Sequence, residues 1–178
     1  VSLVIYMYLT KDFQIKSETL SVLESNVINV TFDNNLKQNK EKLLQLTQSI
    51  NLSNDDSILT SLTSVNDINV NYLNVAFSYA NGRVISSLTN GEVIDFDASQ
   101  RAWFLGAMST PESVYISTPY QDALTSKYVV TLSKAITYGD NQIAVVAIDL
   151  TAASLTSGVE DKEYMFYFDN GIIWLSSN

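Results

Sequence analysis

An arginine next to two aromatic residues is one of the few places in this chain where side-chain chemistry concentrates. Arg101 is followed by Trp103 and Phe104. A guanidinium can hold a carboxylate through two parallel hydrogen bonds, and an aromatic ring supplies a rigid wall beside it. The same residues also fit a surface arginine beside a buried aromatic pair, so both interpretations stay open.

A tyrosine and an aspartate two residues apart form a second candidate group. On a strand, Tyr120 and Asp122 project from the same face, which brings a hydroxyl and a carboxylate together. The alternative is that Asp122 begins a turn at the end of the strand, a position that aspartate often takes.

Asp149 is the most unusual residue, because it ends the apolar run 143–148 and is therefore expected at or near a buried strand. A buried carboxylate is costly unless a ligand ammonium or a row of hydrogen-bond donors compensates it. The alternative is a carboxylate that caps a following helix beginning near Thr151.

Together these groups offer one cation for a carboxylate, two carboxylates for an ammonium, and aromatic walls. That combination is the complement of a free amino acid. Two other hypotheses remain: an enzyme with Asp122 and Asp149 as an acid–base pair, as in glycoside hydrolysis, and a purely structural extracellular domain. No other sequence feature supports catalysis, so we predict no catalytic residues.

Composition excludes several classes of site. The 178 residues include no cysteine and no histidine, which rules out the usual zinc and iron–sulfur sites, thiol nucleophiles and histidine triads. The net charge is -9, with 10 scattered basic residues against 19 acidic ones, so nucleic-acid binding is not expected. We see no phosphate-binding glycine loop and predict no metal and no cofactor.

The elements that must position these residues follow from the periodicity of the apolar side chains. Helical spacing predicts one long helix up to Ile50, and cap residues predict a short helix from about Ser57. Strand-like alternation and turn residues predict the later elements: strands 70–77, 84–88, 114–119, 127–137 and 142–150, and a helix over 99–108. This order predicts an α+β fold with helices on one side of an antiparallel sheet.

The two ends of the chain carry further expectations. The apolar run 1–9 is shorter than the roughly 20 residues that span a bilayer, so it is either the outer end of a membrane helix or the start of a soluble one. No signal peptide is evident. The segments 163–168 and 172–175 predict a hairpin at the other end, after a linker over 151–161.

Four motifs in order give the chain a resemblance to a known family. These are RAWF at 101–104, YISTPYQD at 115–122, VVTLSK at 129–134 and VVAIDL at 145–150. With them, the sequence resembles the double Cache sensor domains of methyl-accepting chemotaxis receptors. The resemblance implies a stalk helix over 1–50, a PAS-like, membrane-distal, ligand-binding lobe over 51–155, and a linker with the opening hairpin of an incomplete membrane-proximal lobe over 156–178.

The resemblance also implies a biological setting. The expected protein is a bacterial receptor of the inner membrane, anchored through segments outside this chain, with the sensor domain facing the periplasm or exterior. The expected partners are a small molecule, foremost an amino acid, and a second copy in a homodimer. A histidine kinase or a diguanylate cyclase is the alternative host.

By the same resemblance, Arg101 holds the ligand carboxylate and Trp103 and Tyr120 line the pocket. The ammonium is assigned to Asp122 and Asp149. Tyrosine is common in the family where this chain has Phe96 and Phe104, so two hydroxyls that assist carboxylate binding are missing. An amine, a sulfonate or a small organic acid therefore remains an alternative ligand.

Overall fold

A computed structural model describes residues 2–69, 71–159, 165–167 and 173–176. The chain divides into two compact units, one formed by Asn35–Leu155 and the other by Val1–Asn34 together with Thr156–Asn178. The larger unit contains all the candidate site residues.

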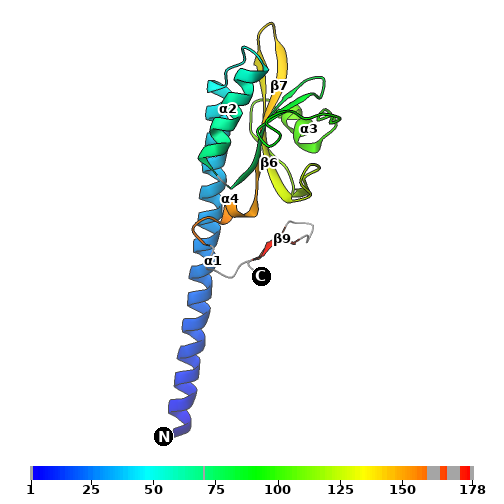
Figure 1. Ribbon diagram of the computed structural model, residues 1–178. Helices are drawn as coiled ribbons and strands as arrows, with labels where there is room; N and C mark the ends of the chain where they lie inside the picture. Colours follow the sequence, from blue (N-terminus) through cyan, green and yellow to red (C-terminus); the bar gives the residue numbers. More distant parts are fainter. Residues whose placement is uncertain (1, 70, 160–164, 168–172, 177–178) are drawn as a thin grey trace. The chain divides into compact units, whose positions relative to one another are not determined.

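The predicted long helix is present as α1, Ser2–Ser49, without an interruption (Figure 1). Within the larger unit it buries Leu43 and Leu46 completely or nearly so. Helix α2, Asp55–Ile68, starts two residues before the predicted Ser57, because the Asn54 side chain caps it by accepting a hydrogen bond from the Ser57 backbone N–H at 2.8 Å.

The sheet of the larger unit is antiparallel throughout. Its strands are β1 Tyr72–Tyr79, β2 Val84–Ser86, β3 Gly91–Glu92, β4 Tyr115–Ile116, β5 Tyr120–Gln121, β6 Tyr128–Tyr138 and β7 Gln142–Leu150. The order is β3-β2-β1-β7-β6-β4, and β5 also pairs with β6. The predicted α+β fold, with a long N-terminal helix before an antiparallel sheet, is confirmed. The sequence did not predict the two-residue strands β3 and β5 as separate elements.

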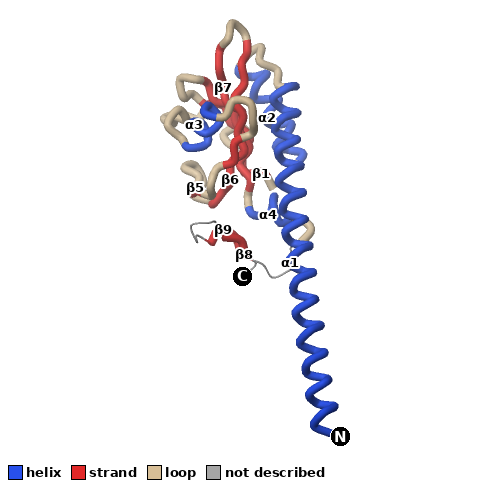
Figure 2. The backbone as a smooth tube through the Cα atoms, turned by 180° about the vertical axis from the view of Figure 1, so that it is seen from behind, coloured by secondary structure: helices blue, strands red, loops and turns tan. Residues whose placement is uncertain are grey.

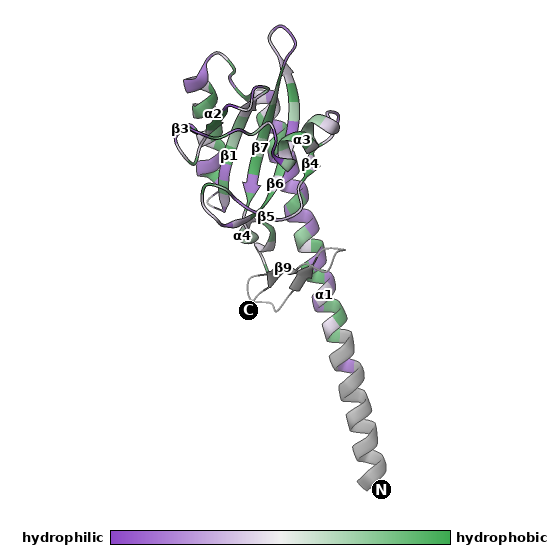
Figure 3. Ribbon diagram, turned by 90° about the vertical axis from the view of Figure 1, so that its right-hand side faces the viewer, coloured by the Kyte–Doolittle hydropathy of each residue, from purple (hydrophilic) through white to green (hydrophobic). Residues whose placement is uncertain are grey.

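Helices cover both faces of this sheet, so the prediction of helices on one side was wrong. Helices α1 and α2 lie on one face, and α3, Ala102–Ser109, lies on the other (Figures 1 and 2). The reason lies in β7, where every residue from Ala144 to Leu150 is buried, so both faces of this strand need an apolar cover. Figure 3 shows the corresponding hydrophobic band along the central strands.

Two glycines are required where backbones and side chains approach closely. Gly82 lies in the β1–β2 turn at φ +86°, and a Cβ there would lie 1.8 Å from Asp97 Oδ1. Gly106 lies on α3, where a Cβ would meet the Tyr115 ring at 2.4 Å. These contacts hold the loop before α3 against the hairpin and α3 against the sheet.

The smaller unit contains the first part of α1, where four apolar residues at helical spacing are exposed: Leu20, Leu23, Val27 and Val30. It also contains the antiparallel pair β8, Met165–Tyr167, and β9, Ile173–Ser176. The turn that the sequence predicts between them lies outside the described residues. A short helix, α4 Ala152–Thr156, occupies part of the predicted linker. Among the described residues, no helix combines the length and apolar character needed to span a membrane.

Candidate functional site

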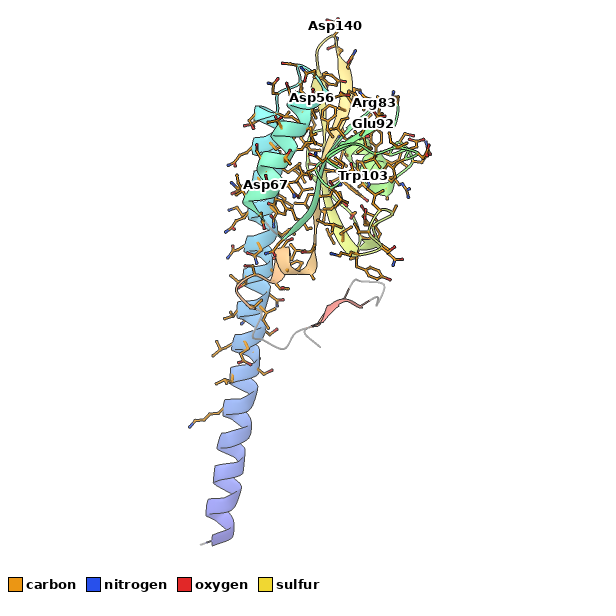
Figure 4. The ribbon with its side chains drawn as sticks, viewed as in Figure 1. Asp56, Asp67, Arg83, Glu92, Trp103 and Asp140 are labelled. Atoms are coloured by element: carbon orange, nitrogen blue, oxygen red, sulfur yellow. The ribbon has the colours of Figure 1, made fainter. Side chains whose placement is uncertain are left out.

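A small cavity lies on the face of the sheet that α3 covers. Side chains from the sheet, from α3 and from two loops line it: Asn74, Ala76, Val84, Val93, Phe96, Trp103, Tyr120, Asp122, Leu124, Ala147 and Asp149. Trp103, labelled in Figure 4, comes from α3. The cavity volume is about 30 Å³, enough for about one water molecule and well below the range of ligand pockets. A ligand as large as an amino acid therefore requires the lining to move apart.

Strand register creates the polar floor of this cavity. Asn74 on β1 and Thr131 on β6 both pair with Asp149 on β7, which lies between them. Directly paired residues of an antiparallel sheet point to the same face. Three central strands therefore present a row of polar side chains, and the small side chains of Ala76 and Ala147 leave space beside it.

A bulge at the start of β1 makes this row possible. Tyr72 pairs with Leu150 but Asn74 pairs with Asp149, so two residues of β1 are matched by one step of β7. Tyr72 points to the helix side, where its hydroxyl donates a 2.6 Å hydrogen bond to Asn39 Oδ1 on α1. Asn74 faces the cavity instead, although simple alternation would place both residues on one face.

The Asp149 carboxylate is buried and accepts hydrogen bonds from neutral groups. Thr131 Oγ1 donates to its Oδ1 at 2.6 Å, and Asn74 Nδ2 donates to its Oδ2 at 3.3 Å. Within the part of the chain that the structure describes, no lysine or arginine forms an ion pair with it. Burial, with a smaller contribution from the Asp122 charge, raises the pKa of Asp149 to about 6.

These contacts decide between the two interpretations of Asp149 offered by the sequence. Its carboxylate binds side chains on β1 and β6, and the start of α4 uses Ser154 Oγ, which accepts from the Thr151 backbone N–H at 3.1 Å. Helix capping by Asp149 is therefore not what the structure shows. The carboxylate faces the cavity with its charge uncompensated by any described cation.

Tyr120, on β5, extends the row of polar groups beyond Thr131. Its hydroxyl lies 2.7 Å from Thr131 Oγ1, and Thr131 is itself held by Ser117, whose Oγ accepts from the Thr131 backbone N–H at 2.9 Å. Burial, together with the negative charge of Asp149, raises the pKa of the Tyr120 hydroxyl. Tyr120 is therefore a neutral hydrogen-bonding group at physiological pH.

Asp122 combines both roles that the sequence left open. Its Oδ2 accepts from the Leu124 backbone N–H at 3.1 Å, and from Thr125 N and Oγ1 at 2.8 and 2.7 Å, so it does organise a turn. It also lines the cavity beside Tyr120. The turn thus fixes a carboxylate at the rim of the site.

Arg101 lies on the surface outside the cavity lining, and the aromatic residues near it divide between the cavity and the core. Arg101 is exposed at the start of α3, and its guanidinium carbon lies 4.7 Å from the centre of the Phe96 ring. Phe96 and Trp103 line the cavity, whereas Phe104 is buried in the core cluster, edge-on to Trp103. The cation–π contact holds Arg101 above the aromatic wall of the site.

Sequence reasoning did not select Asn74 or Thr131. Both are polar residues buried inside strands, Asn74 exposed by 7% and Thr131 by 0%. A polar residue inside an apolar strand is a signal in principle, but pairing with Asp149 depends on a register that the sequence does not reveal.

The described residues contain no group of three or more acidic side chains placed to hold a metal ion. The acceptor groups and apolar walls of the cavity suit the binding of a small organic molecule instead. Acceptors gather at one end of the site, and apolar walls surround the rest, which is how proteins bind small organic cations and zwitterions.

Comparison with known proteins agrees with this geometry. Residues 44–157 match the model of the family described as "Methyl-accepting chemotaxis protein-like, first PDC sensor domain". A 69-residue stretch is 35% identical to the methyl-accepting chemotaxis protein McpC of Bacillus subtilis, covering 39% of this chain and 10% of that protein. The chain therefore spans about a tenth of the length of this curated relative.

Solved chemoreceptor sensor domains share the fold. The ligand-binding domain of Campylobacter jejuni Tlp3, in complex with 4-methylisoleucine, superposes with a TM-score of 0.72 at 25% identity, over 86% of this chain and 66% of that one. The isoleucine-bound form of the Tlp3 domain gives a TM-score of 0.71 at 26% identity, over 86% of this chain and 67% of that one. The Pseudomonas aeruginosa receptor PctC, in complex with GABA, gives a TM-score of 0.71 at 19% identity, covering 84% of this chain and 71% of that one.

The family match covers most of the larger unit, including every predicted site residue from Phe96 to Asp149. The resemblance to Cache-type sensor domains is thereby confirmed, and the family is one of ligand-binding modules rather than enzymes. The chain belongs to the first PDC sensor domains of methyl-accepting chemotaxis protein-like receptors.

Proposed function

We propose that this domain binds a small amino acid as the sensor of a bacterial chemoreceptor, with the ligand ammonium at Asp149. The observation that carries the proposal is a buried carboxylate that faces a cavity and forms no ion pair with a described cation. Such a carboxylate is costly in the free domain, and a ligand that brings a positive charge removes that cost.

The assigned roles follow the positions of the side chains. Asp149 and Asp122 receive the ammonium, and Tyr120 lines the same cavity with its hydroxyl 2.7 Å from Thr131 Oγ1. Arg101 does not line the cavity but lies over Phe96, which does, so its guanidinium would turn from this ring towards the ligand carboxylate when the lining opens. Trp103 supplies the wall along the ligand backbone.

The remaining walls favour an uncharged side chain on the ligand. They are apolar and come from Val84, Val93 and Leu124, with Ala76 and Ala147 on the floor. Desolvating a charged side chain against them would cost several kcal/mol. Tlp3 structures with isoleucine, L-valine and L-norvaline support this preference for short aliphatic amino acids.

The biological setting proposed is a transmembrane receptor with this domain facing the periplasm or exterior. Opening and closing of the lobe around the ligand would shift α1 and so bias two states of a homodimer. McpC supports a chemotaxis output. A histidine kinase or diguanylate cyclase remains the alternative, and a HAMP and coiled-coil sequence followed by a methyl-accepting region in the same gene would decide for chemotaxis.

One observation favours an alternative ligand class. Arg101 is exposed and stacked on Phe96, so the carboxylate end of the site is less enclosed than the ammonium end. An amine without a carboxylate would satisfy the enclosed half of the site.

A thermal-shift screen of the purified domain against the common amino acids, amines and small organic acids tests the proposal, because a ligand that binds only the folded state raises the melting temperature. We expect a rise with short aliphatic amino acids that disappears in Asp149→Ala. A rise with amines alone would keep the sensor and discard the amino acid. No rise with any compound would contradict direct ligand binding.

A further inference from the structure

The directions of the hydrogen bonds around Asp149 can be worked out from the number of hydrogens available. An ionised carboxylate only accepts, so the 2.6 Å bond between Thr131 Oγ1 and Asp149 Oδ1 uses the one hydroxyl hydrogen of Thr131. The 2.7 Å bond between Thr131 and Tyr120 must then be donated by the Tyr120 hydroxyl. Thr131 therefore fixes where the Tyr120 hydrogen points.

This direction leaves the Tyr120 oxygen, which lies near Asp149, with an unused acceptor lone pair. A phenolic oxygen has one hydrogen and acceptor lone pairs, and the hydrogen is held by Thr131. Tyr120 lines the cavity together with Asp149. A ligand donor at this position thus meets an oxygen that accepts and does not compete as a donor.

Asn74 is oriented by the same reasoning. Its Oδ1 accepts from Ser86 Oγ at 2.7 Å, from Ser87 Oγ at 3.3 Å and from the Leu88 backbone N–H at 3.3 Å. These donors fix the amide so that its NH₂ group faces Asp149. The Asn74 amide and the Thr131 hydroxyl therefore both donate from the sheet to the Asp149 carboxylate.

Asp122 presents a free acceptor as well. Its three hydrogen bonds within the turn all end on Oδ2. In the described part of the chain, Oδ1 receives none, and the side chain lines the same cavity. The cavity thus carries acceptor oxygens from Asp149, Tyr120 and Asp122.

We propose that Thr131 is a positioning residue that holds Tyr120 as an acceptor, so that three acceptors select a primary ammonium over N-substituted ligands. A primary ammonium has three N–H donors, one for each of these side chains. An N-methyl ligand has one donor fewer and leaves an acceptor unpaired in a desolvated site. This inference rests on the proposed function, because it concerns the ammonium end of that site.

Binding to matched ligand pairs tests the proposal. The probes are L-valine with N-methyl-L-valine, L-isoleucine with N-methyl-L-isoleucine, and GABA with N-methyl-GABA, measured by isothermal titration calorimetry. We expect the wild-type domain to prefer the primary ammonium by about tenfold or more. Thr131→Val should weaken primary-ammonium binding by about tenfold or more and reduce the preference several-fold. Thr131→Ser should restore both.

Tyr120→Phe provides a second variant that leaves the Thr131 contact to Asp149 in place. It removes the acceptor directly, so the preference for the primary ammonium should fall in the same way. Ser78→Ala is the matched control, since Ser78 has a buried hydroxyl on β1 that donates to the Tyr79 carbonyl at 3.3 Å and does not line the cavity. It should leave affinity and preference unchanged.

A pH profile separates positioning from a merely structural role. The hydrogen bond from Thr131 lowers the pKa of Asp149, so its loss in Thr131→Val should move the midpoint of pH-dependent binding upward. The other titratable groups around Asp149 are Tyr120 from β5 and Asp122 from the following turn, and Arg101 from the start of α3 acts on Tyr120. None of them is altered in Thr131→Val.

The outcomes are distinguishable. Equal affinity of the wild type for both members of each pair, or an unchanged preference in Thr131→Val and Tyr120→Phe, would overturn the role of Thr131. Failure of all six compounds to bind the wild-type domain would instead count against the proposed function.

Discussion

Two carboxylates in the larger unit, Asp55 and Asp149, are treated in opposite ways. Asp55 accepts from Arg83 Nη1 at 2.6 Å and from the Tyr79 hydroxyl at 2.5 Å. The Arg83 and Tyr79 hydrogen bonds lower the pKa of Asp55. Asp149 accepts from neutral side chains alone among the described residues, and burial raises its pKa.

Asp55, Tyr79, Arg83 and Glu92 form the Asp55 cluster, in which the carboxylate charge of Asp55 is compensated by an arginine of the same chain. Arg83 also contacts Glu92 at 3.1 Å and lies over the Tyr79 ring, 4.1 Å from its centre. Figure 4 shows Arg83 and Glu92 close together. The cluster joins the first turn of α2 to the β1–β2 hairpin, so it serves the fold.

The difference is that Asp55 has an arginine partner within the chain, whereas Asp149, the proposed ligand contact, forms no ion pair with a described residue. Asp55, which pairs with Arg83, is partly exposed and contributes to the fold. Asp149, which has no such partner among the described residues, is buried in the cavity. A buried charge of this kind destabilises the free domain, and the proposed ligand ammonium would offset that cost.

The largest expected effect is on ligand affinity at Asp149. Asp149→Asn should weaken amino-acid binding by about 100-fold or more, because the charge that faces the ammonium is lost. Calorimetric titration gives the affinity. Asp55→Asn is the matched control and should bind as the wild type does; equal losses in the two variants would show that folding rather than recognition was affected.

The next largest effect is that of pH on binding. The raised pKa of Asp149, about 6 in the free domain, means that the carboxyl is protonated below this pH. An ammonium binds the ionised form, so affinity should be constant well above pH 6 and fall by about tenfold per pH unit below it. Titrations at pH 5 and 7.5 measure this. Equal affinities would mean that Asp149 is ionised throughout.

Arg101→Ala should have a smaller and selective effect. If the exposed guanidinium binds the ligand carboxylate as proposed, amino-acid affinity should fall by about tenfold while affinity for the matching amine stays the same. L-Valine and isobutylamine are a suitable pair for titration. A comparable loss for both ligands would remove Arg101 from carboxylate binding.

The smallest effect is expected at the Asp55 cluster. Arg83→Ala should lower the free energy of unfolding by about 1 kcal/mol, because solvent screens a pair whose side chains are 32% and 46% exposed. Chemical denaturation measures the loss. Ligand affinity should not change, and a change would mean that this cluster is coupled to the site.

Sequence reasoning predicted the elements whose patterns are local. The apolar run before Asp149 predicted a buried strand, which is β7, and the helix predicted over 99–108 is α3, which starts three residues later at Ala102. The helix on the second face was not predicted there, because the sequence of a strand does not say which element covers it. The order of four motifs carried the resemblance to double Cache domains, and that resemblance added the expected roles of the site residues.

The site could be predicted only in part, because two of its residues depend on long-range geometry. Asn74 reaches the cavity through a bulge after Tyr72, and the bulge is not visible in an alternating pattern. Thr131 meets Asp149 through the β6–β7 register. The direction of the Tyr120 hydroxyl follows from that pairing and so requires the structure.

The most direct test of the account is the number of protons released when an amino acid binds. Calorimetry at pH 6 in buffers of different ionisation enthalpy gives this number. If the ammonium compensates Asp149, about half a proton should be released at pH 6, where the free carboxyl is half protonated, and none at pH 8 or in Asp149→Asn. Binding at pH 6 without proton release would contradict the claim that the ligand ammonium neutralises Asp149.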